Sequence, residues 1–179
     1  MNQPFSFAGS EDRYDGRTVT LMARNTGREV PEDAIVVHLN QVRAWGNTTR
    51  CDELFIVAND SSFCTASRAF ARLGENKPLE AALRCPKVRV RKMEFSEEKI
   101  RAVFKPVSSA VSIISSDAPI TMTTGLFAAL FYRARGAKVM LFGFSEDRDY
   151  HGVPCFHTPS VELERELFRS FPDFYPPAR

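Results

Sequence analysis

The chain has 179 residues, of which 44% are hydrophobic and 26% charged, and its formal net charge at pH 7 is +2. These values fit one globular domain with its own core, and they exclude the strongly basic surface of a protein that coats nucleic acid. The longest apolar block, Leu126 to Tyr132, is far too short to cross a bilayer. We therefore expect a soluble protein with no transmembrane segment and no nucleic-acid partner.

The first sixteen residues are polar and irregular, so we expect an N-terminal arm (1–16) ahead of a single domain (17–179). They lack the basic start and apolar run of a secretory signal. The cysteines match no zinc spacing, and we expect reduced structural thiols. Together these features predict a cytoplasmic protein. The four cysteines are Cys51, Cys64, Cys85 and Cys155.

Short runs of branched and apolar residues, bounded by turn-forming segments, predict the strands. The fourth strand carries Arg89 and Arg91 on one face, which we interpret as the solvated side of an edge strand. In chain order the expected strands are 18–23, 34–39, 52–58, 87–93, 111–115 and 138–144. Helices are expected at 67–73, 77–83, 96–104 and 125–135, with a last helix starting just after His157, capped by Thr158.

The strand, helix and strand over residues 111–144 form a βαβ unit, which implies a parallel pair with a right-handed crossover. The helix at 125–135 is apolar nearly all round, as a helix packed against a sheet should be. We therefore predict an α/β fold, a single Rossmann-like domain with a mostly parallel sheet covered by helices on both faces.

Ligands of open α/β sheets bind beyond the carboxyl ends of the strands. Asn25 and Asn40 follow the first two strands, as Asn59 follows the third, although asparagine also favours such turns for backbone reasons. The loop before the apolar helix ends in Thr123-Thr124-Gly125, where free N–H groups and the helix dipole favour an anion. The alternative is that one threonine serves only as an N-cap.

Two of the three histidines, His151 and His157, follow the last predicted strand. His157 lies just before a helix start and could act as a general base, because an imidazole titrates near neutral pH. Glu162 would orient that imidazole or only complement the helix dipole. The triplet Asp147-Arg148-Asp149 is of a kind that holds divalent ions, although such triplets are frequent by chance.

These segments, in this order, resemble the motifs of the sialyltransferases of glycosyltransferase family 29 over about residues 18 to 168. The runs LMARNTG and VVHLNQVR look like the first motif, which places Asn25 and Asn40 at the asparagines that hold CMP. PITMTTG, the apolar helix and VMLFGF resemble the second motif, and imply that Thr123, Thr124 and Gly125 contact the donor. The fold implied is the sialyltransferase-like variant of the GT-A fold.

Two shorter elements complete the resemblance. Tyr150-His151 is similar to the element that steadies the donor phosphate, and His157 to Glu162 reproduces the pattern His-x-x-x-x-Glu, whose histidine deprotonates the acceptor. The resemblance implies inverting, metal-independent transfer of an acidic keto-sugar, sialic acid or a relative such as Kdo, from a CMP donor. The acceptor would be a hydroxyl of a glycan or lipid-linked saccharide, with no further cofactor.

The chain also departs from the family pattern. Arg24 stands in place of a motif glycine and His38 in place of an arginine. Neither cysteine of the family disulfide is kept, because Thr20 and Gly136 occupy the two positions, as a cytosolic relative would show. Two other functions stay open: a non-catalytic nucleotide-sugar-binding module of the same fold, and a structural protein with no ligand. A metal requirement would instead point to Asp147 and Asp149. The sequence also leaves a homodimer open.

Overall fold

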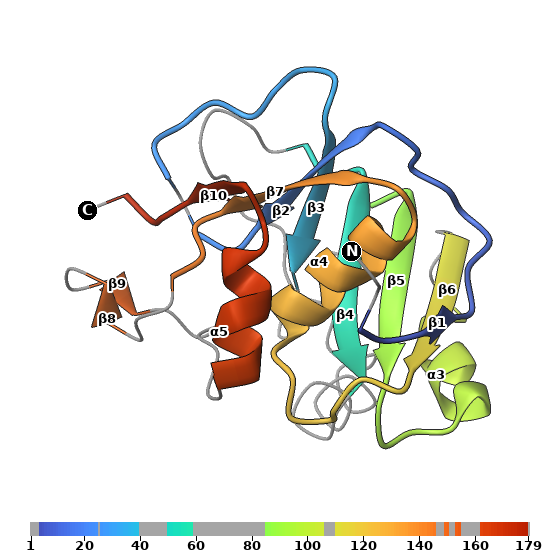
Figure 1. Cartoon of the computed structure of the whole chain (residues 1–179). Helices are drawn as coiled ribbons and strands as arrows, with labels where there is room; N and C mark the ends of the chain where they lie inside the picture. Colours follow the sequence, from blue (N-terminus) through green and yellow to red (C-terminus); the bar gives the residue numbers. More distant parts are fainter. Residues whose placement is uncertain are drawn as a thin grey trace.

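The computed structural model describes residues 4–24, 26–39, 50–58, 85–105, 110–145, 149–150, 153–154 and 162–178. These residues form an eight-stranded, mostly parallel sheet, a separate two-stranded sheet and three helices (Figure 1), so the predicted α/β class is confirmed. The large sheet contains β1 (Phe7–Ala8), β2 (Thr18–Met22), β3 (Ile35–Leu39), β4 (Glu53–Ala58), β5 (Lys87–Lys92), β6 (Ala110–Ser116), β7 (Lys138–Phe142) and β10 (Asp173–Tyr175). The other elements are β8 (Asp149–Tyr150), β9 (Val153–Pro154), α3 (Glu97–Phe104), α4 (Thr124–Ala134) and α5 (Glu162–Arg169).

The six predicted strands are all present, with bounds that agree to within one or two residues, and so are the helices predicted at 96–104 and 125–135. Ser96 caps α3 by accepting the Lys99 N–H, as a serine before an acidic first turn should. The helices predicted at 67–73 and 77–83, and Thr158, lie outside the described residues.

The strand order is β1-β6-β5-β4-β3-β2-β7-β10, and every pair is parallel except β1 with β6. From β2 the chain moves outward strand by strand to β6, then returns through α4 to β7 on the other side of β2. The order therefore reverses between β2 and β7. In open α/β sheets such a switch point, at the carboxyl ends of the strands, is where ligands bind.

The strand β5 is central, not an edge, so our interpretation of its arginines was wrong. It pairs with β4 on one side and β6 on the other, and Arg89 and Arg91 are only 2% and 3% exposed. Alternation of charged and apolar residues shows that two faces differ, but it does not say whether water or protein covers the charged face.

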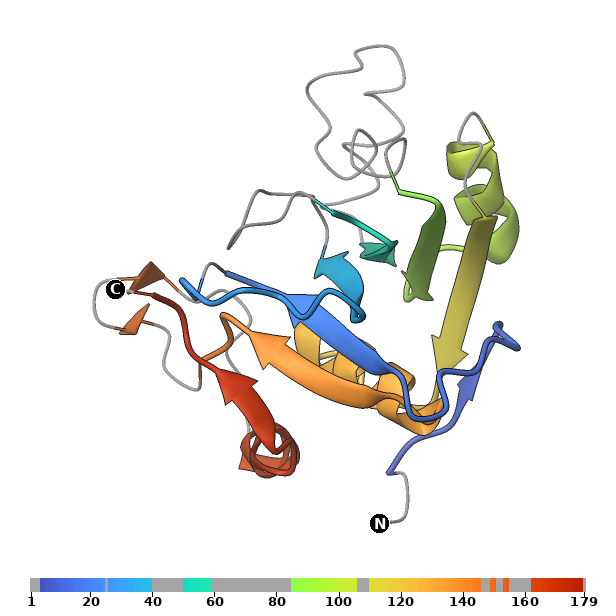
Figure 2. The same cartoon turned by 90° about the horizontal axis from the view of Figure 1, so that it is seen from above.

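Of the three groups of buried apolar residues in the described part of the chain, two join the sheet to its helices, and these two take alternate residues of β4. Phe55 packs on the aromatic rings of α4, which runs across the sheet in Figure 1, and its group also includes Phe168 of α5. Leu54 and Ile56 belong to the group that holds Ile100 of α3. Each such side chain contributes about 1.5–3 kcal/mol by leaving water. From above (Figure 2), the strands twist progressively, with α3 near β6 and α5 near β10.

The described part of the N-terminal arm packs against the domain. Phe7 and Ala8 form β1 and pair antiparallel with β6. The Tyr14 N–H donates to the Arg135 carbonyl at 2.8 Å, and the Tyr14 side chain is 2% exposed. These contacts place β1 at the outer edge of the sheet and Tyr14 beside the C-terminal end of α4.

Cys51 and Cys85 are joined by a disulfide, so the expectation of four reduced thiols was wrong. Parallel pairing of Glu53 with Lys87 brings the residues before β4 and β5 side by side, with the two cysteine Cα atoms 5.6 Å apart. The 34-residue separation gives no hint of this in the sequence, because it depends on the register of two strands. No helix among the described residues is long and apolar enough to span a membrane.

Candidate functional site

Three segments meet at the switch point, beyond the carboxyl ends of β2 and β7. The Ala23 N–H after β2 donates to the Phe142 carbonyl of β7 at 2.9 Å. Gly143 has φ +75°, and a Cβ there would lie 2.2 Å from the Arg24 carbonyl oxygen, so glycine is required both by backbone conformation and by space. The next residue, Phe144, packs against Gly125 in the first turn of α4. The ends of β2 and β7 and the start of α4 therefore form one contiguous structure.

Gly125 has a packing reason to be glycine. A Cβ at this position would lie 2.4 Å from Cε1 of Phe144, which is itself 1% exposed. The sequence suggested that Gly125 lets a ligand approach the backbone, whereas the structure fills the space beside its Cα with an aromatic ring. The glycine thus serves the close approach of α4 to the segment after β7.

A carboxylate from another helix lies at the N-terminus of α4. The backbone N–H of Thr123, the N-cap residue, donates to Oε1 of Glu164 in α5 at 3.3 Å, and Glu164 is 3% exposed. The Thr123 side chain makes no capping hydrogen bond, and its Oγ1 is buried without a partner among the described residues. The positive end of the helix attracts an anion as expected, and at this amide the protein supplies that anion itself.

Arg91 holds the loop before α4 from the opposite side. Its Nη1 donates to the Met122 carbonyl at 2.6 Å and its Nη2 to the Pro119 carbonyl at 2.9 Å, with the guanidinium 4.2 Å from the centre of the Phe127 ring. Burial lowers the pKa of Arg91 to about 10, and the negative charge of Glu164 opposes that shift. A pocket of about 150 Å³ adjoins this loop, lined by Arg91, Phe127, Lys92, Met93, Ser116, Ala118 and Ile120.

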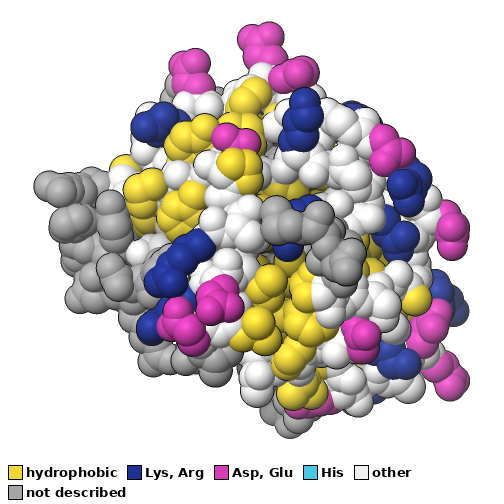
Figure 3. Space-filling model, viewed as in Figure 1, with side chains coloured by type: hydrophobic (Ala, Val, Ile, Leu, Met, Phe, Trp, Pro, Cys, Tyr) yellow, Lys and Arg dark blue, Asp and Glu magenta, His cyan; other side chains and the backbone are white. Residues whose placement is uncertain are grey.

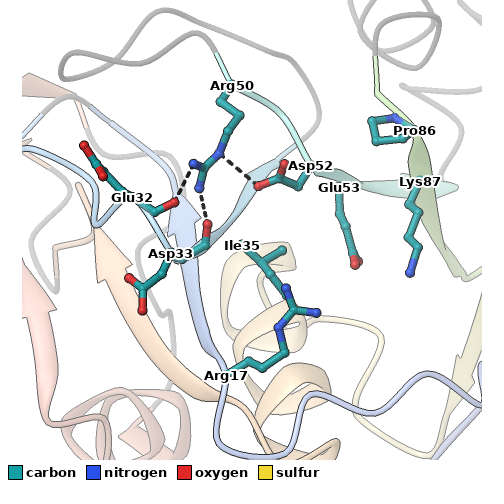
Figure 4. A pocket seen from close by; sticks show the side chains of 10 residues that line it. Arg17, Glu32, Asp33, Ile35, Arg50, Asp52, Glu53, Pro86 and Lys87 are labelled. Carbon is teal, nitrogen blue, oxygen red and sulfur yellow. Dashed lines mark hydrogen bonds and ion pairs between the residues drawn. The ribbon is translucent and has the colours of Figure 1, made fainter.

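A larger pocket, of about 390 Å³, lies at the opposite, amino edge of the sheet (Figure 4). The Arg50 guanidinium is fixed there by Asp52 at 3.1 Å and by the carbonyls of Glu32 and Ala34. Figure 4 shows the side chains of Arg17, Glu53 and Lys87 turned toward a common space. The lining carries both signs of charge, so it selects neither an anion nor a cation by net charge.

Glu53 connects this amino-edge pocket to a buried hydrogen-bond network. Its carboxylate accepts from the Tyr14 hydroxyl at 2.7 Å, the Tyr132 hydroxyl at 2.8 Å and Arg89 Nε at 3.0 Å. Arg89 also contacts Asp12 and Ser112. Burial disfavours the charge of Arg89, but Glu53 and the tyrosines outweigh it and raise the pKa, while burial raises the pKa of Tyr132. This dense pairing stabilises charges rather than preparing one for proton transfer.

The structure brings some of the predicted site residues together. Thr123, Thr124 and Gly125 lie at the start of α4 beside the ends of β2 and β7. Glu162 begins α5, where its exposed carboxylate pairs with Arg169 at 3.2 Å and Arg165 at 3.6 Å. Tyr150 lies in β8, opposite Val153. Six predicted residues lie outside the described part of the chain: Asn25, Asn40, Asn59, Asp147, His151 and His157.

Sequence reasoning missed Arg91 and Glu164. The signal for Glu164 was available, because Glu164, Leu167, Phe168 and Phe171 follow the spacing of one helix face. That face packs on α4, so it buries Glu164 and leaves Glu162 exposed. For the described residues, no group of three histidine, cysteine or acidic side chains has the arrangement of a metal site.

Comparisons of the chain with protein-family models, with curated proteins and with solved structures find no match. The sialyltransferase resemblance therefore rests on the motifs alone, and what the protein does must be inferred from the geometry of the switch point.

Proposed function

We propose that the protein binds a CMP-linked acidic keto-sugar at the carboxyl edge and transfers the sugar to a hydroxyl of a glycan or lipid-linked saccharide. The supporting observation is the meeting of β2, β7 and the first turn of α4 at the switch point. Segments of the two resembling motifs, LMARNTG and VMLFGF, lie far apart in sequence and come into contact there through Arg24 and Gly143. This is the position at which α/β folds bind nucleotides.

We further propose a Rossmann-like domain covered by helices on both faces. Alternate residues of β4 pack in different apolar groups, one with α4 and α5 and one with α3, which supports coverage of the two faces. The return of the chain from β6 through α4 to β7 supports the doubly wound connection.

The proposed chemistry assigns one role to each residue. Asn25, Asn40 and the turn at 123–125 bind the donor. His157 takes the proton of the acceptor hydroxyl while its oxygen attacks the anomeric carbon. The bond from that carbon to the CMP phosphate oxygen breaks, and the phosphate leaves with the electron pair beside His151. Because Glu164 takes the Thr123 amide, the donor contacts fall on Thr124 and the amides that follow it.

Calorimetric titration with CMP, and hydrolysis assays with CMP-sialic acid and CMP-Kdo, test the proposal. We expect CMP to bind more tightly than UMP, and Thr124→Val to weaken that binding about tenfold. Thr121→Val is the matched control, since Thr121 is an exposed threonine of the same loop. His157→Ala should retain CMP binding and lose turnover. Absence of binding heat with CMP, CDP and UMP contradicts the proposal.

A non-catalytic nucleotide-sugar-binding module is the second candidate. The observation that favours it is Glu164, because a protein carboxylate already accepts the first N–H at the N-terminus of α4. This module would bind CMP and the intact CMP-sugar with no release of free sugar over hours. Measurable hydrolysis by the wild type that His157→Ala abolishes excludes it.

A further inference from the structure

The loop at 119–123 is held through its backbone by two charged side chains from different elements. Arg91 of β5 donates to the carbonyls of Pro119 and Met122, at 2.9 and 2.6 Å. Glu164 of α5 accepts the N–H of Thr123 at 3.3 Å. The Met122 carbonyl and the Thr123 N–H belong to the same peptide group, so a cation and an anion hold its two ends.

Both side chains are expensive to bury. Each is 3% exposed, and taking a charged group out of water costs several kcal/mol unless partners compensate. The hydrogen bonds that Arg91 makes to neutral carbonyls compensate it less completely than carboxylates would. Glu164 supplies the opposite charge, and the Phe127 ring covers the guanidinium. Apolar residues of similar volume often stabilise a core at least as well as buried charges do, so stability alone does not account for this pair.

The loop that they hold leads directly into the turn of the proposed donor site. Met122 is 3% exposed, whereas Ile120, two residues earlier, is 56% exposed. Figure 3 shows hydrophobic side chains gathered in this part of the surface, between α5 and the loop before α4. The loop thus has a fixed inner end, where Thr123 enters α4, and an exposed tip.

We propose that Arg91 and Glu164 are positioning residues that clamp the peptide group between Met122 and Thr123 and so set the shape of the donor-binding turn at 123–125. The inference rests on the proposed function for the role of that turn. Glu164 also lies seven residues after His157 in the sequence, near the start of α5. The same contact therefore links the donor turn to the helix that follows the proposed base.

The first experiment needs no ligand. In ¹⁵N-labelled protein, the Thr123 amide should resonate downfield and resist hydrogen exchange, because it donates to a buried carboxylate. Glu164→Gln keeps an acceptor without the charge and should move this amide upfield with the fold intact. Arg91→Met should raise its exchange rate at least tenfold. Arg101→Met is the matched control, because Arg101 forms an exposed pair with Glu97 on α3.

The second experiment measures CMP affinity and, where turnover is found, KM and kcat for the CMP-sugar. Arg91→Met should weaken CMP binding at least tenfold, Arg91→Lys should restore part of that loss, and Arg101→Met should change it less than twofold. A folded Arg91→Met with wild-type Thr123 exchange and wild-type CMP affinity overturns the clamp. If Arg91→Met does not fold, Arg91→Lys and Glu164→Gln replace it in the test. The clamp is then overturned if both variants keep the wild-type exchange rate of the Thr123 amide and the wild-type affinity for CMP. Wild-type protein that binds no CMP contradicts the proposed function, while the amide measurements still decide the clamp.

Discussion

Arg89 and Arg91 lie two residues apart on one face of β5, and both are almost fully buried, yet their surroundings differ sharply. Arg89, nearer the amino edge, contacts two carboxylates, Glu53 and Asp12, and the hydroxyl of Tyr14. Arg91, nearer the carboxyl edge, donates to two loop carbonyls. The pKa of Arg89 is accordingly raised and the pKa of Arg91 lowered.

This difference separates a part of the sheet whose buried charges are paired with each other from the part that holds the proposed site. At the amino edge each buried charge has a charged partner in direct hydrogen-bond contact. At the carboxyl edge a less fully compensated cation fixes a loop, and two glycines allow close approach of backbone segments. A buried cation that donates to neutral carbonyls departs from the usual pairing of buried charges, and such departures are expected at functional sites. Changes at the amino edge should therefore cost stability, and changes at the carboxyl edge should cost ligand binding.

The largest expected effect is that of Arg89→Met. The substitution leaves the Glu53 carboxylate buried without its cation, which should cost about 3–5 kcal/mol of unfolding free energy. Urea denaturation measures this loss, and CMP affinity of the protein that stays folded should not change. Arg13→Met is the control, because Arg13 pairs with Asp15 in water and should matter little. A loss below about 1 kcal/mol for Arg89→Met would show that the network is dispensable.

The disulfide at the same edge should give the next largest effect. Closing a loop of 34 residues restricts the unfolded chain, so losing the bond should cost about 2–4 kcal/mol. For a domain of this size the melting temperature should fall by roughly 4–16 °C. Scanning calorimetry with and without a reductant measures the fall. The double variant Cys51→Ser, Cys85→Ser should melt at the lower temperature under both conditions; if it responds to reductant as the wild type does, the bond is not the cause.

Much of the fold could be predicted from the sequence because β2, β3, β4 and β7 are mostly apolar runs bounded by polar or turn-forming residues, and α4 is an apolar helix with a clear end. β1 and β10 could not be, because two or three residues carry no periodic signal. The burial of Arg89 and Arg91 was missed because their partners come from the arm, from β4 and from α5, and no local pattern records such distant pairings. The disulfide was missed for the same reason.

For the candidate site, the sequence located the turn at 123–125 on the carboxyl edge but did not reveal two of the contacts that shape it. Gly125 was assigned to ligand approach, and its Cα faces the Phe144 ring. Glu162 was predicted to orient His157 or to complement the dipole of its own helix, and the contact of Glu164 with the N-terminus of α4 was not predicted. The spacing from His157 pointed to Glu162, whereas the apolar face of α5 determines that Glu164 is the buried glutamate.

At the carboxyl edge, Gly125→Ala should cost about 1–3 kcal/mol, because the added Cβ meets the Phe144 ring and something must shift. The same shift displaces the donor turn, so CMP affinity should fall more than in Arg89→Met. Denaturation and calorimetric titration measure the two effects. Adding Phe144→Leu should relieve the contact and restore part of both; if it restores neither, the ring is not what requires glycine.

A pH-dependent effect is expected at His38, a buried residue of β3 whose ring Nε2 lies 3.0 Å from the Arg50 carbonyl. Burial lowers the pKa of His38 below the usual value near 6.5. Near that pH the unfolded chain takes up a proton that the folded chain does not, so the unfolding free energy should decline as the pH falls below about 6.5. Urea titrations at pH 5 and pH 7.5 measure the decline. His38→Gln keeps a donor for the carbonyl and should reduce the decline; an undiminished decline assigns it to other groups.

The smallest effect on stability is expected for Glu162→Gln. The Glu162 side chain is 61% exposed, and its pairs with Arg165 and Arg169 are solvated, so the unfolding free energy should change by about 0.5 kcal/mol or less. Enzyme activity distinguishes the two roles predicted for Glu162. If Glu162 orients His157, kcat for the CMP-sugar falls while CMP affinity stays; if it only complements the α5 dipole, both stay. Glu164→Gln is the variant to compare with Glu162→Gln. It weakens a buried contact with the donor turn, so it should lower CMP affinity. If Glu162→Gln and Glu164→Gln change CMP affinity equally, Glu164 has no positioning role that the exposed Glu162 lacks.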